Sequence, residues 1–116
     1  MLPKKFRLKE KKDFQEVIQK GKRLEQEFLI LKVLENKLKM TRIGFVVGKR
    51  VSKKAVCRHK ARRRLSEVVK SNLPLIKTGY DLIFFGKKGL SNKDFREIKK
   101  TIQEFLKKAR ILKNDD

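Results

Sequence analysis

The chain has 116 residues, and 34 Lys and Arg against 13 Asp and Glu give it a formal net charge of +21. A charge of this size favours a polyanionic partner, while 39% hydrophobic residues are enough for one domain with a core. One cysteine and one histidine exclude an internal disulfide and a Cys/His zinc site, and the apolar runs are too short to span a membrane. We predict a single cytoplasmic domain over residues 1–116, with no secretory signal and with a frayed tail at 113–116.

A short helix is predicted over Lys12–Lys20, and Gly21 is suited to end it. Its apolar residues have the i, i+3, i+4 spacing of one helix face: Phe14, Val17 and Ile18. Phe14 and Ile18, together with alternate residues of the next predicted strand, Phe28–Leu34, can form a shallow apolar groove. Exposed aromatics beside basic residues stack unpaired bases, so this groove is a candidate site for single-stranded nucleic acid. The alternative is that these residues belong to the core.

Two strands are predicted next, over Phe28–Leu34 and Arg42–Gly48, because both runs are rich in β-branched, aromatic and other apolar residues. The polar segment Asn36–Lys39 reads as the turn between them. Since the two runs are close in sequence, we expect them to form an antiparallel pair.

The most distinctive segment runs from Asn36 to Ser66, with twelve Lys and Arg and no Asp or Glu. Its second half is predicted to form a helix over Lys54–Ser71, followed by the helix-ending Asn72 and Pro74. At 100° per residue, its apolar residues fall in one stripe: Cys57, Ala61, Leu65, Val68 and Val69. The opposite side carries His59, Arg62, Arg63, Ser66 and Lys70. Basic charge fixed on a folded helix is typical of a nucleic-acid binder, and the alternative is a merely solvated basic face.

A third strand is predicted over Tyr80–Phe85, with both faces covered because its apolar run is nearly continuous. Ser91 is predicted to cap the last helix, with Asp94 three residues later. The apolar residues of this helix recur at helical spacing: Phe95, Ile98, Ile102, Phe105, Leu106 and Ala109. The order of elements, which leaves room for one further short strand, predicts an α+β fold with helices packed on one mixed sheet.

The residues offer little support for an active site made of protein groups. His59 can act as a general base, but it is more simply a surface residue that touches a ligand or water. Cys57 lies on the apolar stripe, where a small buried filler is its expected role. The acidic residues show no spacing typical of a carboxylate metal site, and no phosphate-binding glycine loop is present. We therefore predict no catalytic residue and no metal ligand.

Several motifs occur in a recognisable order along nearly the whole chain. The first is an RL…DF…G pattern at Arg7, Leu8, Asp13, Phe14 and Gly21. The second begins with a small residue and two basic ones and continues into the basic helix: Gly48, Lys49, Arg50, Ala55, Arg58, His59, Lys60, Arg62 and Arg63. The third is YDLIFFGKKG followed by an amphipathic helix. In these features the chain resembles the protein subunit of bacterial ribonuclease P.

The chain departs from the family pattern in two places. The family's Arg-Asn-Arg appears here as Arg58-His59-Lys60, where the lysine keeps the charge of arginine and loses its bidentate fork. In the groove, family members often carry further aromatics where this chain has Ile18 and Leu31. We expect phosphate binding to be kept and base stacking in the groove to be reduced.

The resemblance implies a ribosomal-protein-like fold, with helices on a mixed four-stranded sheet and a left-handed βαβ crossover. It implies a ribonucleoprotein endonuclease whose catalytic RNA subunit removes the 5′ leader of precursor tRNA with Mg²⁺ held mainly by RNA. The protein then binds no cofactor itself, and its partners are this RNA and precursor tRNA, with no membrane and no DNA. The implied RNA contacts are Lys49, Arg50, Lys53, Lys54, Arg58, His59, Lys60, Arg62 and Arg63. The implied leader contacts are Phe14, Ile18 and Leu31.

Three alternatives remain on sequence grounds. A non-catalytic RNA-binding protein, such as a ribosomal protein or an RNA chaperone, would carry the same charge. A protein-only nuclease would need a carboxylate cluster to hold metal ions, which the sequence does not offer. A membrane-surface role is disfavoured because the apolar stripe of the basic helix is narrow and is needed for the core.

Overall fold

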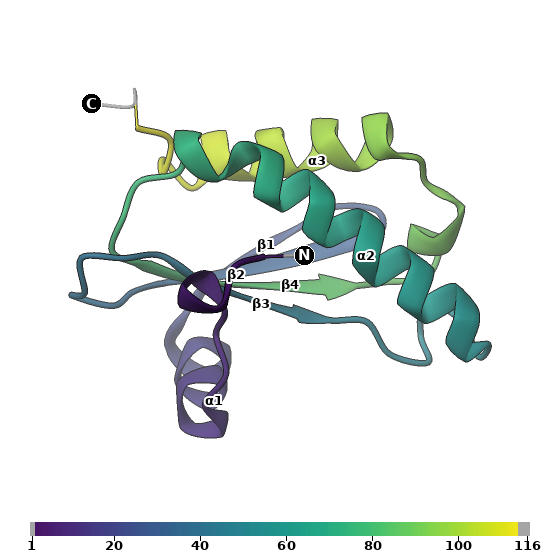
Figure 1. The fold of residues 1–116 in the computed structure, drawn as a ribbon, viewed down its shortest axis with the longest axis horizontal. Helices are drawn as coiled ribbons and strands as arrows, with labels where there is room; N and C mark the ends of the chain where they lie inside the picture. Colours follow the sequence, from purple (N-terminus) through teal and green to yellow (C-terminus); the bar gives the residue numbers. More distant parts are fainter. Residues whose placement is uncertain (1, 114–116) are drawn as a thin grey trace.

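The computed structural model describes residues 2–113 and contains one four-stranded sheet with helices on both faces (Figure 1). The strands are β1 (Lys22–Glu25), β2 (Leu29–Glu35), β3 (Arg42–Val46) and β4 (Tyr80–Gly86). The helices are α1 (Lys11–Lys20), α2 (Ala55–Asn72) and α3 (Phe95–Lys108), with short 3₁₀ turns η1 (Lys4–Phe6), η2 (Leu73–Leu75) and η3 (Leu90–Asn92). Helices α2 and α3 lie on one face of the sheet and α1 lies on the other (Figure 1). The α+β class and the mixed four-stranded sheet are therefore confirmed.

The predicted antiparallel pairing of β2 with β3 is wrong, because the strand order is β1-β2-β4-β3. Strand β4 lies between them, antiparallel to β2 and parallel to β3. The connection after β2 encloses the start of β4: the Asn36 N–H donates to the Gly79 carbonyl at 2.9 Å, and the Gly79 N–H donates to the Met40 carbonyl at 3.3 Å. These bonds hold β2 and β3 one strand apart. The nearly continuous apolar run of β4 fills that central place, where both faces are covered.

Strand β1 is the element whose position the sequence analysis did not predict. Its four residues are mostly exposed, and it forms one edge of the sheet beside β2. A short, charged edge strand carries little hydrophobic pattern, which is why only the number of strands could be anticipated. Strand β3 forms the other edge and is joined to β4 through α2, so β3–α2–β4 is the βαβ unit of the fold. The left-handed crossover of this unit stays a prediction from the family resemblance.

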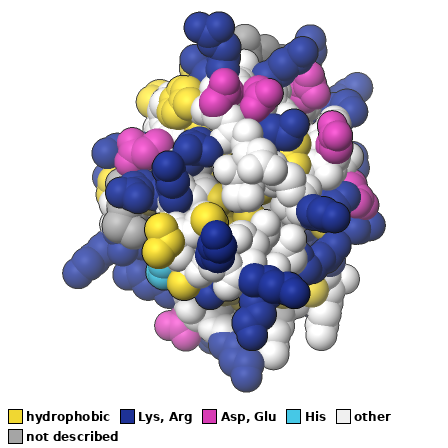
Figure 2. Space-filling view, turned by 90° about the vertical axis from the view of Figure 1, so that its right-hand side faces the viewer, with side chains coloured by type: hydrophobic (Ala, Val, Ile, Leu, Met, Phe, Trp, Pro, Cys, Tyr) yellow, Lys and Arg dark blue, Asp and Glu magenta, His cyan; other side chains and the backbone are white. Residues whose placement is uncertain are grey.

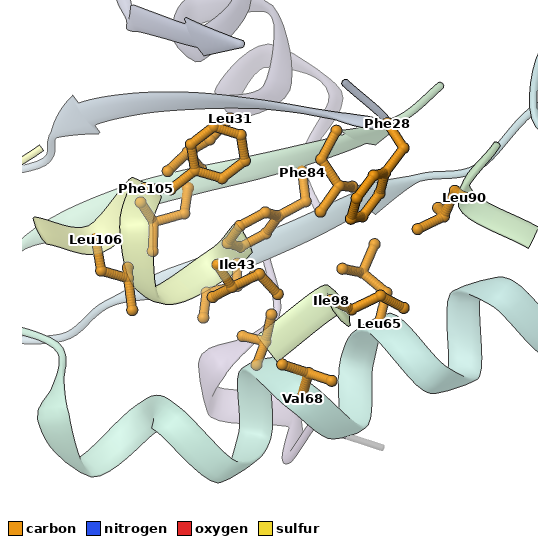
Figure 3. Close-up of a cluster of buried hydrophobic side chains, with 14 of the residues drawn as sticks. Phe28, Leu31, Ile43, Leu65, Val68, Phe84, Leu90, Ile98, Phe105 and Leu106 are labelled. Carbon is orange, nitrogen blue, oxygen red and sulfur yellow. The ribbon is translucent and has the colours of Figure 1, made fainter. Parts of the chain in front are cut away.

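The main core fills the space between the sheet and helices α2 and α3. Figure 3 shows side chains such as Leu31 and Phe84 from the strands facing Phe105 of α3 and Val68 of α2. All four are fully buried, and each buried side chain of this size contributes about 1.5–3 kcal/mol. A smaller cluster lies beneath α1 on the opposite face, where Val17 packs with Leu8 and Ile83. The sheet is thus buried on one face and only partly covered on the other.

The predicted cap of the last helix is wrong, because Ser91 lies in the η3 turn. The helix begins after Asp94, whose Oδ1 accepts the Glu97 N–H at 2.9 Å while Glu97 Oε2 accepts the Asp94 N–H at 3.0 Å. This reciprocal capping box satisfies two backbone donors that a helix start otherwise leaves unpaired. At the other end, the N–H of Lys113, where fraying was predicted to begin, donates to the Leu75 carbonyl at 2.8 Å. The rest of the predicted tail, 114–116, lies outside the described residues.

Candidate RNA interface

The predicted RNA-binding residues form one continuous surface along the loop after β3 and the first half of α2. Eight of the nine are exposed, and only Arg58 is half-buried: Lys49, Arg50, Lys53, Lys54, His59, Lys60, Arg62 and Arg63 are the exposed ones. Figure 2 views the end of the molecule at which α2 begins, and Lys and Arg side chains cover much of it. Long cationic side chains that share one surface and reach solvent can each approach a phosphate of a folded RNA.

The charges of α2 are fixed in place because the opposite stripe of the helix is anchored in the core. Ala61, Leu65, Val68 and Val69 are buried as predicted, and Cys57 is half-buried. Ser66 lies on the same side of the helix as Arg62 and Arg63, as predicted, and lines a cleft with them. It is nevertheless buried, with only 5% of the residue exposed. The basic side of α2 is therefore narrower than the helical wheel indicates.

Arg58 is placed differently from the other cations. Its guanidinium Nη1 donates to the carbonyl oxygens of Ser52 and Lys53 at 3.1 and 2.9 Å. These bonds hold the backbone of the loop that leads into α2 and carries Lys53 and Lys54. Positive charge at a helix N-terminus opposes the helix dipole by a few tenths of a kcal/mol, roughly, for each charge. A bound phosphate would offset that cost, so Arg58 fixes a loop that is suited to an anion.

Sequence reasoning missed two further arginines that organise this surface. Arg64 is half-buried, and its Nη1 donates to the Lys93 carbonyl, which ties α2 to the segment before α3. Arg7 is also half-buried, and its Nε donates to the Leu2 carbonyl at 2.7 Å. Arg7 was noted only as part of a motif. Nothing in the local pattern indicates that it holds the N-terminal segment beside α2.

A cleft of about 510 Å³ lies between this N-terminal segment, strand β3 and helix α2. Apolar residues and Gly44 form most of its lining: Leu2, Leu8, Phe14, Ile43, Gly44 and Phe45. Polar and basic residues complete it: Arg7, Lys9, His59, Arg62, Arg63 and Ser66. Gly44 is needed here, because a Cβ at this position would meet two carbons of the Phe14 ring at 2.5 and 2.7 Å. The ring of Phe14 therefore lies directly against the backbone of β3, in a cleft partly walled by the basic helix.

The predicted leader groove does not exist in the form expected, because Leu31 lies on the other side of the sheet. Its exposure is 0%, and it packs in the main core with α2 and α3. Neighbouring residues of a strand point to opposite faces, so Ile30 rather than Leu31 faces α1. Ile18 is 41% exposed, and the Lys32 Nζ donates to its carbonyl at 2.7 Å. Phe14 and Ile18 thus lie on the α1 side, and Leu31 cannot join them.

The α1 side of the sheet instead carries an apolar strip across three strands. Phe85 of β4 is paired with Ile30 of β2 and with Val46 of β3, so the three side chains lie side by side. Ile30 is buried, Phe85 is half-buried and Val46 is exposed. We call these three residues the open strip. It provides the apolar surface that the sequence analysis assigned to Leu31.

A polar cluster holds α1 against the same side of the sheet. Arg42 binds Asp81 through two bonds, Nε–Oδ1 at 2.9 Å and Nη2–Oδ2 at 2.7 Å, and binds Asp13 of α1 through Nη1 at 3.1 Å. The Asn36 Nδ2 donates to Asp81 Oδ1 at 2.8 Å. The hydrogen bond from Arg42 to Asp81 raises the pKa of Arg42 above its ordinary value, although burial acts in the opposite direction. The guanidinium therefore stays charged and links α1, β3 and β4.

Carboxylates do not form a metal site in the part of the chain that is described. Over residues 2–113, no three His, Cys, Asp or Glu side chains are grouped as metal ligands. Asp13 and Asp81 both bind Arg42, which occupies oxygens that a metal ion would need. Within the same range, no helix has the length and hydrophobicity required to cross a membrane.

Comparisons with known proteins agree with this geometry. The family model for ribonuclease P matches residues 2–110. The ribonuclease P protein component of Alkaliphilus oremlandii is 35% identical over 106 residues, covering 91% of this chain and 92% of that protein. The component from Pseudanabaena is 34% identical over 113 residues, covering 97% of each chain.

Solved structures show the same fold. The RNase P protein of Staphylococcus aureus superposes with a TM-score of 0.81 at 25% identity, covering 91% of this chain and 96% of that one. The protein from Thermotoga maritima, solved in complex with 1-(4-fluorophenyl)-2-thiourea, gives a TM-score of 0.78 at 30% identity, covering 87% and 97%. The chain therefore belongs to the ribonuclease P protein family and is a protein component of this tRNA-processing endoribonuclease.

Proposed function

We propose that this chain binds the catalytic RNA subunit of ribonuclease P through the basic surface of the β3–α2 loop and α2. One observation supports the proposal: the segment from Asn36 to Ser66 has twelve Lys and Arg and no acid, and eight of the nine residues predicted to contact RNA are exposed there. The exposed cations contact phosphates, and Arg58 positions the loop that carries Lys53 and Lys54. Each phosphate contact adds about 0.7 to 0.9 to the salt dependence of binding.

The 5′ leader of precursor tRNA is proposed to lie along the α1 side of the sheet. Phe14 and Ile18 keep their proposed roles there, and the open strip replaces Leu31. Apolar and aromatic side chains beside lysines bind unpaired bases with little sequence preference. Lys32, which lies on this face, supplies positive charge near the leader phosphates. A leader would therefore meet a different surface from the one that binds the catalytic RNA.

Catalysis is proposed to reside in the RNA subunit, with Mg²⁺ bound by RNA oxygens. This chain supplies positioning and charge neutralisation, and two of its carboxylates, Asp13 and Asp81, are engaged in contacts with Arg42. We place the assembly in the cytoplasm, as the single cysteine and the family resemblance favour.

Reconstitution tests this function. The purified chain is added to its cognate catalytic RNA and a precursor tRNA at low Mg²⁺, and 5′ cleavage is measured with and without the chain. We expect faster cleavage at the 5′ maturation site, because the protein lowers the repulsion between the two RNAs. RNA binding with no gain in cleavage would favour a non-catalytic RNA-binding protein instead. Cleavage by the chain without the RNA subunit would favour a protein-only nuclease if replacing one of the chain's Asp or Glu residues abolished it.

A further inference from the structure

We infer that the cleft between the N-terminal segment, β3 and α2 holds one unstacked base of the catalytic RNA, with His59 forming part of its wall. This inference rests on the proposed function and assigns a second kind of contact to the same RNA. Phosphate contacts on the outer side of α2 fix orientation, whereas a base in the cleft would be recognised by its flat apolar surface.

The shape and lining of the cleft suit a nucleotide. Its volume of about 510 Å³ falls within the range of ~300–1,000 Å³ that is usual for small organic ligands. Phe14 and Phe45 supply aromatic surface, and Gly44 lets the Phe14 ring lie against the strand without side-chain rearrangement. Phe45 is held in turn by stacking on Phe84, with ring centroids 5.9 Å apart. The aromatic surface is therefore fixed before any ligand arrives.

The charges around the cleft select an anionic ligand that also has an apolar part. Arg62 and Arg63 line the cleft and are exposed, so their guanidinium groups can reach the phosphate on either side of an inserted base. Ser66 donates its hydroxyl to the Arg63 carbonyl at 3.0 Å, which leaves its oxygen lone pairs free to accept a bond from a base amino group. The imidazole of His59 adds a flat ring at the same wall.

The position of the cleft assigns this base to the catalytic RNA and not to the leader. One wall consists of α2 residues that belong to the basic surface, namely His59, Arg62 and Arg63. The open strip lies on the α1 face of the sheet, and none of its residues lines the cleft. A strand of RNA that follows α2 therefore reaches the cleft from the basic surface, and it meets the leader surface only at Phe14, which borders both.

The test measures the affinity of His59→Ala for the catalytic RNA alone, at several salt concentrations and one fixed pH. Loss of one stacked base should weaken binding roughly 5- to 150-fold, with an unchanged log–log salt slope. His59→Asn, which keeps a hydrogen-bonding side chain and loses the ring, should weaken binding in the same way. Val56→Ala is the matched control, since Val56 is 78% exposed on the same helix and does not line the cleft.

Chemical probing then identifies the occupant. Dimethyl sulfate and a carbodiimide report the Watson–Crick edges of unpaired bases, and one base of the catalytic RNA should be protected by the wild-type chain and reactive with His59→Ala. Phe14→Leu, checked for folding by circular dichroism, should expose the same base. The inference would be overturned if His59→Asn bound with full affinity, or if His59→Ala flattened the salt slope. It would also be overturned if protection of the base required a precursor tRNA that carries a leader. If the wild-type chain does not bind the catalytic RNA at all, the proposed function fails together with it.

Discussion

Replacing Arg42 by Met is expected to destabilise the fold strongly, although Arg42 lies outside the basic surface. Methionine is of similar length and removes only the charge and the three hydrogen bonds to Asp81 and Asp13. The side chains of Arg42 and Asp81 are 22% and 5% exposed, so the bidentate pair is largely shielded from water. Without the guanidinium, the Asp81 carboxylate stays buried and has lost its positively charged partner. It keeps the hydrogen bond from the Asn36 amide.

The expected loss follows from this burial. Removing one partner of a buried ion pair costs about 3–5 kcal/mol, because the other charge is left uncompensated. The bond to Asp13 is a single one to the first turn of α1, and Asp13→Asn should cost only about 1 kcal/mol. Since small domains are stable by about 5–15 kcal/mol, Arg42→Met should remove a large fraction of the stability.

Denaturation by urea, followed by circular dichroism, measures these losses in free energy of unfolding. The double variant Arg42→Met/Asp81→Asn should lose less than the sum of the two single variants, because each removes the partner of the other. A loss below about 1 kcal/mol for Arg42→Met, or strict additivity in the double variant, would refute the buried-pair account.

Three further stability predictions follow from the same structure. Leu31→Ala should cost about 2–5 kcal/mol in urea unfolding and leave leader binding by the folded variant unchanged, since Leu31 is a core residue. Asp94→Ala should cost about 1 kcal/mol by removing the cap of α3, and an unchanged midpoint would contradict the capping box. The hydrogen bond from Lys87 lowers the pKa of Glu25 below its ordinary 4.5, so its stabilisation is present above that value and disappears as pH falls through the lowered pKa. Glu25→Gln should therefore unfold earlier than wild type at neutral pH and equally at strongly acidic pH.

Local periodicity was enough to predict the three helices and most of their buried residues, although Ile18 and Phe95 of the apolar faces are exposed. The stripe of α2 was read correctly for Ala61, Leu65, Val68 and Val69, because helical spacing alone fixes which residues share a side. The burial of Ser66 was not predicted, because it lines a cleft shared with Leu2 and Leu8 of the N-terminal segment, which the periodicity of the helix does not show.

The pairing of the strands, and the face of the sheet on which a strand residue lies, were harder to predict. The two errors made there have a physical origin. Proximity in sequence favoured a β2–β3 pair, whereas β4 takes the central place because its residues are apolar on both faces. Leu31 was assigned to the wrong face because β2 is also apolar on both faces, so its pattern does not show which side meets α1. The cleft beside α2 combines residues from distant segments, and no local motif predicts it.

The salt dependence of binding to the catalytic RNA tests most directly whether α2 is the RNA-binding surface. Arg62→Ala and Arg63→Ala are compared with Lys22→Ala, a matched loss of one exposed charge on β1 at the opposite edge of the sheet. The account predicts that each arginine variant binds more weakly and flattens the log–log slope by about 0.7 to 0.9, while Lys22→Ala changes little. Unchanged affinity and slope for both arginine variants would contradict the assignment of this surface to RNA.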